Sequence, residues 1–175
     1  MNQNLFFQIF NLGHKIFLLD QIMIFGAAYL IWLTFLLTIF FTIKGGSKEK
    51  LSLLLIALGV IFAEVLIFII HAVYFEPRPF ITYHLTPLIK HGADAAFPSG
   101  HTTIMAVIAW GFTFAKSKWA PLFLVLMLWV GFARIFVGVH YPLDILGGVV
   151  VGFISIMLVW NLKKLFASKV DPFRA

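Results

Sequence analysis

The sequence predicts an all-α protein, a polytopic membrane helix bundle of five transmembrane helices preceded by an N-terminal interfacial helix. The chain of 175 residues is 62% hydrophobic and 11% charged, with a mean hydropathy of +1.02. Soluble domains carry about 25% charged residues. The apolar residues form long windows separated by lysine-bearing loops, and a spanning helix needs about 20 such residues. We therefore expect one integral-membrane domain over residues 1–175.

Five apolar windows account for the expected spans: Gln21–Ile43, Leu51–Ile70, Thr102–Ala115, Trp119–Val137 and Ile145–Leu162. Four of them are long enough to cross a bilayer directly, and the third reaches spanning length if its helix begins near Ser99. The apolar residues of positions 1–19 follow a loose helical stripe, which is typical of an interfacial helix. The transmembrane bundle is then expected over 20–165 and a cytoplasmic tail over 166–175.

The basic residues predict the orientation of the bundle. They follow the first, third and fifth windows: Lys44, Lys48, Lys50, Lys116, Lys118, Lys163, Lys164, Lys169 and Arg174. The positive-inside rule places these loops in the cytoplasm, so the loop over residues 72–98 and the turn around His140 lie on the external side. Because the same lysines explain the net charge of +6, no nucleic-acid partner is expected. The absence of cysteine excludes disulfides and thiolate chemistry.

Some polar residues have purely structural interpretations. Glu64 lies inside the second window, and no second intramembrane acid is present to form a proton relay with it. We therefore expect a hydrogen-bonded carboxyl group in the bundle interior. His84 and His91 occupy a loop with little hydrophobic periodicity and have no partner at a clear spacing, so both are expected to be exposed. That external loop is a candidate rim or lid over a site.

A polar cluster interrupts the apolar sequence where the fourth window ends and the fifth begins. Arg134 lies near the end of the fourth window, and His140 and Asp144 lie between the two windows. The planar fork of an arginine suits phosphate or carboxylate. Asp144 follows His140 by four residues and can accept from one imidazole N–H, which leaves a lone pair on the other ring nitrogen. Pro142 suits the first turn of the fifth helix, where its missing N–H costs nothing.

Two further motifs are predicted at the same membrane face. Arg78 stands between two prolines, which stiffen the backbone and exclude helix there. Ser99 follows a proline and precedes an apolar run, so it is suited to cap a helix whose free N–H groups favour an anion. Gly100 lets the backbone approach a ligand closely, and His101 occupies the first turn.

Together these motifs predict one site for a reaction on an anion. Two arginines and a helix N-terminus form the anion site, and two histidines and an aspartate provide a nucleophile, an acid and an orienting group. A zinc site is the alternative, with Asp94, His101, His140 and Asp144 as possible ligands. Since the arginines already supply the positive charge that a metal would bring, neither a metal nor another cofactor is expected.

The three motifs resemble the signature of the type 2 phosphatidic acid phosphatase superfamily. The matching residues, which agree in order and spacing, are Arg78-Pro79, Pro98-Ser99-Gly100-His101 and Arg134 followed by His140 and Asp144. The local sequence around each motif is similar to the undecaprenyl-diphosphatases of the bacitracin-resistance type. Two positions depart from the signature, because His71 stands where the family usually has lysine and Ala133 where it usually has serine.

The resemblance implies metal-independent hydrolysis through a covalent phosphohistidine. His140 would attack phosphorus, Asp144 would hold the tautomer of His140, and His101 would protonate the leaving oxygen and then activate water. The residues implied to hold the phosphate are Arg78, Arg134, Ser99 and Gly100, with His71 assisting in place of the lysine.

The function favoured by the sequence is removal of the terminal phosphate of undecaprenyl diphosphate, which recycles the carrier lipid of cell-wall synthesis. The resemblance implies a bacterial inner membrane, with the active site on its external face. One alternative is a phosphatase of phosphatidylglycerol phosphate, phosphatidate or lipid A, and another is a non-catalytic membrane protein that binds phosphorylated lipids. The expected partners are a phosphorylated lipid and the bilayer, while sequence ranks neither lipid tails nor oligomeric states.

Overall fold

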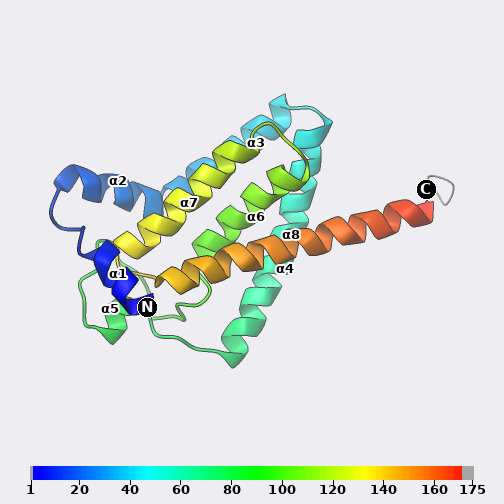
Figure 1. Ribbon diagram of the computed structural model, residues 1–175. Helices are drawn as coiled ribbons and strands as arrows, with labels where there is room; N and C mark the ends of the chain where they lie inside the picture. Colours follow the sequence, from blue (N-terminus) through cyan, green and yellow to red (C-terminus); the bar gives the residue numbers. More distant parts are fainter. Residues whose placement is uncertain (1, 171–175) are drawn as a thin grey trace.

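The computed structural model of the protein describes residues 2–170, and within them the chain is all-helical (Figure 1). The helices in order are α1 (Asn2–Phe10), α2 (Phe17–Ala28), α3 (Leu30–Lys44), α4 (Ser47–Val73), α5 (Pro79–Thr82), α6 (Gly100–Phe114), α7 (Ala120–Phe136) and α8 (Pro142–Val170). The predicted all-α class is confirmed.

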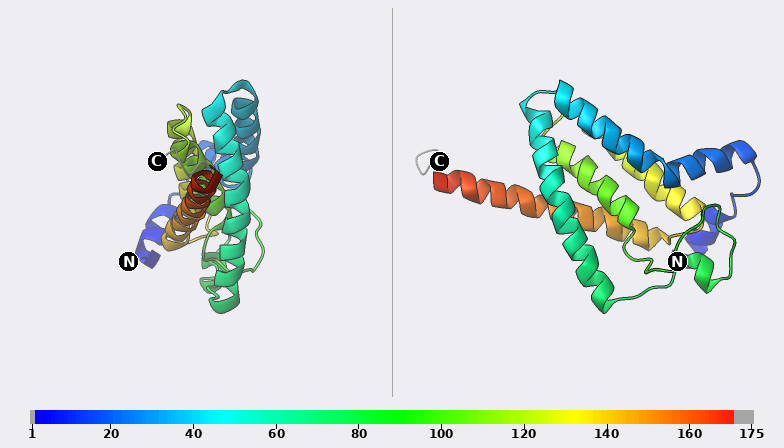
Figure 2. Two further views of the ribbon diagram at one scale, coloured as in Figure 1. Left: turned by 90° about the vertical axis from the view of Figure 1, so that its right-hand side faces the viewer. Right: turned by 180° about the vertical axis from the view of Figure 1, so that it is seen from behind.

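Helix α6 forms the centre of the bundle, where it contacts α4, α7 and α8 (Figures 1 and 2). Nine of its 15 residues are buried. The contact with α8 depends on small residues, because a Cβ added at Gly152 would lie 2.6 Å from the Cβ of Ala106 and one at Gly148 would lie 2.9 Å from the carbonyl oxygen of Ser99. Small residues let two helix backbones approach closely. This approach fixes the start of α6 against the start of α8.

The candidate membrane spans in the described residues number two or three. Helices α4 and α8, the latter through Leu165, are long and apolar enough to cross a bilayer, and α2 with α3 forms one more if the bent pair counts as a single span. Helix α6 has 15 residues, a length of about 22 Å, against a hydrocarbon thickness of about 30 Å. The third window thus forms a helix that begins next to Ser99, as expected, but this helix is shorter than the hydrocarbon thickness.

The first predicted span is broken rather than continuous. Helices α2 and α3 meet at Tyr29 with an angle of 56° between them. The two halves pack in different places: Gly26 of α2 lies against Trp129 and Ala133 of α7, whereas α3 also packs on α4. A uniformly apolar window contains no signal for such a change of partner, so the break was not predictable from hydropathy.

Glu64 differs from its predicted place in the bundle interior. Its side chain is exposed on the outer face of α4, and it makes no hydrogen bond or ion pair with the described residues. The packed face of α4 is the stripe that carries Gly59, Ala63 and Ile67, and Glu64 lies beside that stripe. The prediction that Glu64 is a hydrogen-bonded carboxyl group in the bundle interior is therefore wrong.

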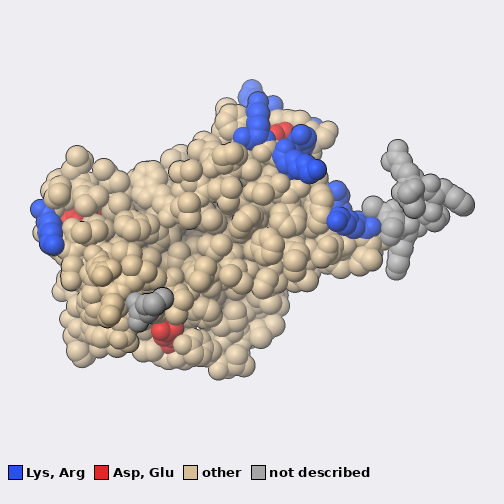
Figure 3. Space-filling view, viewed as in Figure 1, with Lys and Arg blue, Asp and Glu red and all other residues tan. Residues whose placement is uncertain are grey.

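The two ends of the bundle differ in charge. Most of the visible Lys and Arg side chains gather over the turn between α3 and α4 and over the C-terminal part of α8 (Figure 3). The start of α6, the end of α7 and the start of α8 lie together at the other end (Figures 1 and 2). Helix α1 packs at this second end, where Phe6 is buried against Tyr141. Residues 171–175 of the predicted tail lie outside the described residues.

Candidate active site

His140 occupies the short connection between α7 and α8 and is 1% exposed. Its Nδ1 lies 3.3 Å from Oδ2 of Asp144, one helical turn further along the chain. The same oxygen accepts from the backbone N–H of Tyr141 at 2.7 Å. Helix α8 begins at Pro142, as predicted, and this start places Asp144 in the first turn beneath the imidazole ring.

Two arginine side chains face the other nitrogen of His140. Nη1 of Arg78 lies 2.9 Å from Nε2 of His140, and Nη2 of Arg134 lies 3.4 Å from it. A guanidinium only donates, so Nε2 is the acceptor and Nδ1 carries the proton that points to Asp144. Burial first, and then the charges of Arg134 and Arg78, hold the pKa of His140 well below its usual value. The ring is therefore neutral near pH 7, with its lone pair aimed at the arginines.

Arg78 is held by contacts on every side of its guanidinium. Asp94 accepts from Nε at 3.2 Å and from Nη2 at 3.0 Å, which is a bidentate pair. The carbonyl oxygens of Ala95 and Val139 accept from Nη2 and Nη1 at 3.2 and 3.0 Å. Burial acts to raise the pKa of Asp94, but the hydrogen bonds and charge of Arg78 outweigh it and leave the pKa below its usual value. The Nη1 hydrogen directed at His140 is thus the donor left for a ligand.

Arg134 enters the site from the last turn of α7 and is 2% exposed. Its Nη1 donates to the carbonyl oxygen of Ala27 at 3.2 Å, next to the break between α2 and α3. Its buried Nε has no hydrogen-bond partner among the described residues. A buried guanidinium with an unused N–H is suited to an anion that brings its own acceptor oxygens.

The start of α6 completes the cluster. Ser99 is the N-cap, and its hydroxyl oxygen accepts from the N–H of Thr102 at 3.5 Å, as predicted for a capping residue. The N–H of Ser99 donates to the carbonyl oxygen of Asp144 at 3.0 Å, which joins this helix start to that of α8. A Cβ at Gly100 would meet nothing within 4 Å, so the backbone there borders open space. His101 is half-buried and makes no hydrogen bond with the described residues.

The predicted residues do not all meet. Arg78, Arg134, His140 and Asp144 are joined by direct contacts, and the Ser99–His101 turn is tied to them through Asp144. His71, in contrast, is exposed on the last turn of α4 and makes no polar contact with any residue of this cluster. Within residues 2–170, no group of three or more His, Cys, Asp or Glu side chains is arranged to hold a metal ion.

Three parts of the site were not assigned from the sequence. Asp94 was considered only as a metal ligand, but it pairs with Arg78. His91 was expected to be exposed, yet its side chain is 19% exposed and its ring packs edge-on to His140 with the centroids 6.3 Å apart. The carbonyl oxygen of Ala27 has no sequence signature at all. The loop that carries Asp94 and His91 lacks periodicity, so only the fold could bring it to the arginines.

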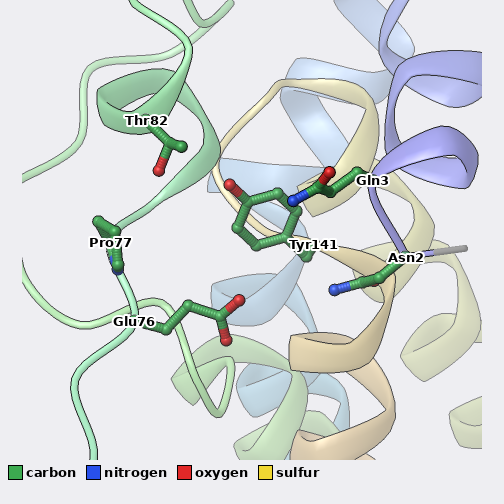
Figure 4. A pocket seen from close by; sticks show the side chains of 6 residues that line it. All are labelled: Asn2, Gln3, Glu76, Pro77, Thr82 and Tyr141. Carbon is green, nitrogen blue, oxygen red and sulfur yellow. The ribbon is translucent and has the colours of Figure 1, made fainter.

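A separate pocket of about 360 Å³ lies between α1, the end of α5 and the loop before α5 (Figure 4). Its lining residues are Asn2, Gln3, Glu76, Pro77, Thr82 and Tyr141. The carboxylate of Glu76 disfavours a phosphate group there. The anion site is therefore the arginine pair beside His140, and neither arginine lines this pocket.

Known proteins resemble both the sequence and the fold. The sequence profile of the PAP2 superfamily matches residues 52–166, a range that contains every predicted site residue. Undecaprenyl-diphosphatase BcrC of Bacillus subtilis (strain 168) is 36% identical over 98% of this chain and 89% of that protein. The crystal structure of LpxE from Aquifex aeolicus matches with a TM-score of 0.72 and 27% identity, over 91% of this chain and 94% of that chain. A PAP2-type phosphatidylglycerolphosphate phosphatase from Bacillus subtilis matches with a TM-score of 0.55 and 26% identity, over 98% and 89%.

Proposed function

The chain belongs to the PAP2 superfamily, and on this premise we propose that it is a membrane phosphatase that removes the terminal phosphate of undecaprenyl diphosphate. The observation that carries the proposal is the environment of His140. One ring nitrogen is tied to Asp144, while the other points its lone pair at two buried arginines. The similarity to BcrC over nearly the whole chain supports a prenyl diphosphate as the substrate.

The first chemical step is attack by Nε2 of His140 on the terminal phosphorus. A P–N bond forms while the bond between phosphorus and the bridging oxygen breaks, and undecaprenyl phosphate leaves. His101, in the first turn of α6, donates a proton to the departing oxygen. Arg78, Arg134 and the N–H groups at the start of α6 bind the equatorial oxygens, where the negative charge of the transition state collects.

The second step returns the enzyme to its starting state. Water attacks the phosphorus of the phosphohistidine, His101 accepts a proton from that water, and the P–N bond breaks to release inorganic phosphate. Asp144 stabilises the positive charge that the imidazole ring of His140 carries in the intermediate. Ser99 contributes chiefly through its place as the cap, since its oxygen already accepts from Thr102.

We further propose that the chain crosses the membrane five times, with the bent pair α2–α3 as one crossing. The separation of the lysine-rich end from the cluster around His140 supports an external active site, by the positive-inside rule (Figure 3). Helices α6 and α7 are shorter than the hydrocarbon thickness and pack within the bundle. The site then lies in a recess where a prenyl chain stays in lipid while its diphosphate reaches the arginines.

Phosphate release by the purified full chain tests this function. The wild type in detergent micelles with EDTA should release phosphate from undecaprenyl diphosphate, and His140→Ala should release none above background. His84→Asn is the matched control, because His84 is an exposed loop histidine with a positive φ of 51° that asparagine tolerates. Undiminished release by His140→Ala, or loss of wild-type release in EDTA, would contradict the proposal.

A second candidate substrate is phosphatidylglycerol phosphate. The structural match to a phosphatidylglycerolphosphate phosphatase over nearly the whole chain favours it, although the TM-score is lower than for LpxE. The attacked group is again a terminal phosphate, and the leaving group is then an alcohol rather than a phosphate. The two lipids are compared by kcat/KM in mixed micelles at equal surface concentration. The lipid with the higher kcat/KM is the better substrate.

A further inference from the structure

His91 is held over the site by two acceptors on one side of its ring. Its Nδ1 lies 3.3 Å from the carbonyl oxygen of Gly92 and 3.5 Å from Oδ1 of Asp94. Since both neighbours only accept, Nδ1 carries a proton, and Nε2 on the opposite edge has no hydrogen-bond partner within the described residues. The ring stands edge-on to His140. A second His–Asp pair therefore lies next to that of the proposed nucleophile.

Asp94 links this second pair to the phosphate-binding arginine. Its two carboxylate oxygens accept hydrogen bonds from Nε and Nη2 of Arg78, and Oδ1 also faces Nδ1 of His91. The position of His91 is thus coupled to the guanidinium that contacts His140. A ring placed in this way is a fixed part of the site, in contrast to the exposed His84 of the same loop.

The donors around His140, together with the N–H groups at the start of α6, are the ones that bind the attacked phosphoryl group. Arg78 uses its other N–H groups on Asp94, Ala95 and Val139, which leaves the donor that points at His140. Arg134 supplies its contact to His140 and its unpaired Nε. A diphosphate brings a second charged phosphate, bonded to the one that is attacked, and that group needs a further donor. The alcohol of a phosphomonoester has no such need.

We propose that His91 is a specificity-determining residue that binds the second phosphate of a diphosphate substrate through Nε2, while Asp94 holds Nδ1. The proposal rests on the proposed phosphatase function and defines its substrate class as diphosphates rather than phosphomonoesters. His91 contacts the phosphate of the leaving group, whereas His101 transfers the proton to the bridging oxygen.

The charge of His91 changes when such a substrate binds. In the empty site, burial first and then the charges of Arg78 and Arg134 lower the pKa of His91, so the ring is neutral and Nε2 has no proton to donate. Asp94 acts in the opposite direction but does not outweigh them. The negative charge of a second phosphate favours the protonated ring, in which both nitrogens donate. Diphosphate binding should therefore take up a proton at His91.

Calorimetry with two small phosphorus-containing probes tests the proposal independently of turnover. The ligands are methylenediphosphonate, which cannot be hydrolysed, and orthophosphate, titrated into the full chain in detergent micelles. His91→Ala should weaken diphosphonate binding by about 10- to 100-fold, the size of one charge-assisted hydrogen bond, and change orthophosphate binding by less than about twofold. His91→Gln keeps an N–H without a charge and should recover part of the loss. His84→Asn should bind both ligands as the wild type does.

Titrations in buffers of different ionisation enthalpy supply a second readout. Wild-type diphosphonate binding should take up a proton that His91→Ala and His91→Gln do not, a change that a merely structural role for His91 would not produce. Equal weakening of both ligands, or unchanged diphosphonate binding, would overturn the assignment. Phosphate release from undecaprenyl diphosphate by the wild type is measured separately. If the wild type releases no phosphate, the proposed function is refuted. If it releases phosphate normally and His91→Ala binds the diphosphonate as tightly as the wild type, only the role of His91 is refuted.

Discussion

Replacing Asp144 with asparagine separates the charge of this carboxyl group from its hydrogen bonds. Both side-chain contacts of Asp144, with Nδ1 of His140 and the N–H of Tyr141, are made by the single oxygen Oδ2. The other oxygen, Oδ1, is buried without a hydrogen-bond partner among the described residues. An asparagine that places its oxygen at Oδ2 keeps both acceptor contacts, so the tautomer of His140 is preserved. What the variant loses is the negative charge.

The size of that loss follows from the geometry. A carboxylate stabilises a hydrogen-bonded donor by about 1.5 kcal/mol more than a neutral acceptor does. A full positive charge about 4 Å away interacts with it by about 4 kcal/mol at an effective dielectric constant of about 20. Because the imidazole becomes positive as Nε2 bonds to phosphorus, Asp144→Asn should lower kcat/KM by about 10- to 1,000-fold.

Asp144→Ala provides the contrast, since it also removes the acceptor. The N–H groups of His140 and Tyr141 are then buried without a partner, and the wrong tautomer of His140 becomes accessible. We expect kcat/KM for alanine to fall at least about tenfold below that of asparagine. Phosphate release is compared only among variants whose unfolding temperature lies within a few degrees of that of the wild type. Wild-type activity in Asp144→Asn, or equal activity in the two variants, would refute this division between charge and tautomer.

Three further predictions follow from the same contacts. Arg78→Lys loses the fork that spans Asp94 and reaches His140, so kcat/KM should fall about 10- to 100-fold, and an unchanged value would exclude Arg78 from the phosphate site. Because the pKa of His140 is lowered, the nucleophile stays neutral as the pH falls to about 6.5. Protonation of His140 should therefore reduce kcat/KM only below about pH 6.5. A kcat/KM that falls to half its maximum already above about pH 7 would contradict this. His71→Ala should change kcat/KM by less than about threefold, because His71 is exposed and makes no polar contact with the site, and a loss above about tenfold would restore its predicted role.

The parts of the site that were predictable from the sequence depend on short-range geometry. His140 and Asp144 are four residues apart across a helix start, and a helix start at Pro142 brings them together whatever the rest of the fold does. The capping role of Ser99 is equally local, since it depends on the next turn of the same helix. Family resemblance, together with the predicted membrane side, placed Arg78 beside them across a separation of 62 residues.

The parts that were not predictable depend on segments without periodicity or on the backbone. His91 and Asp94 belong to an irregular loop, where neither hydropathy nor spacing indicates a partner. The carbonyl oxygen that holds Arg134 belongs to Ala27, two residues before the break at Tyr29, and hydropathy gives no sign of that break. Glu64 was assigned to the interior because acids are costly in membranes, but the contact stripe of α4 passes beside it.

Trapping the covalent intermediate tests the central claim most directly. His101→Ala retains the nucleophile and lacks the proposed acid of the first step and base of the second. Because the leaving group is a phosphate, which departs readily without a proton, the second step should be slowed more than the first, and the phosphoenzyme should accumulate. After brief reaction with undecaprenyl diphosphate and an alkaline quench, peptide mass spectrometry should find one phosphate on His140. The double variant His101→Ala/His140→Ala should carry none. Phosphate on any other residue, or a labelled double variant, would contradict His140 as the nucleophile.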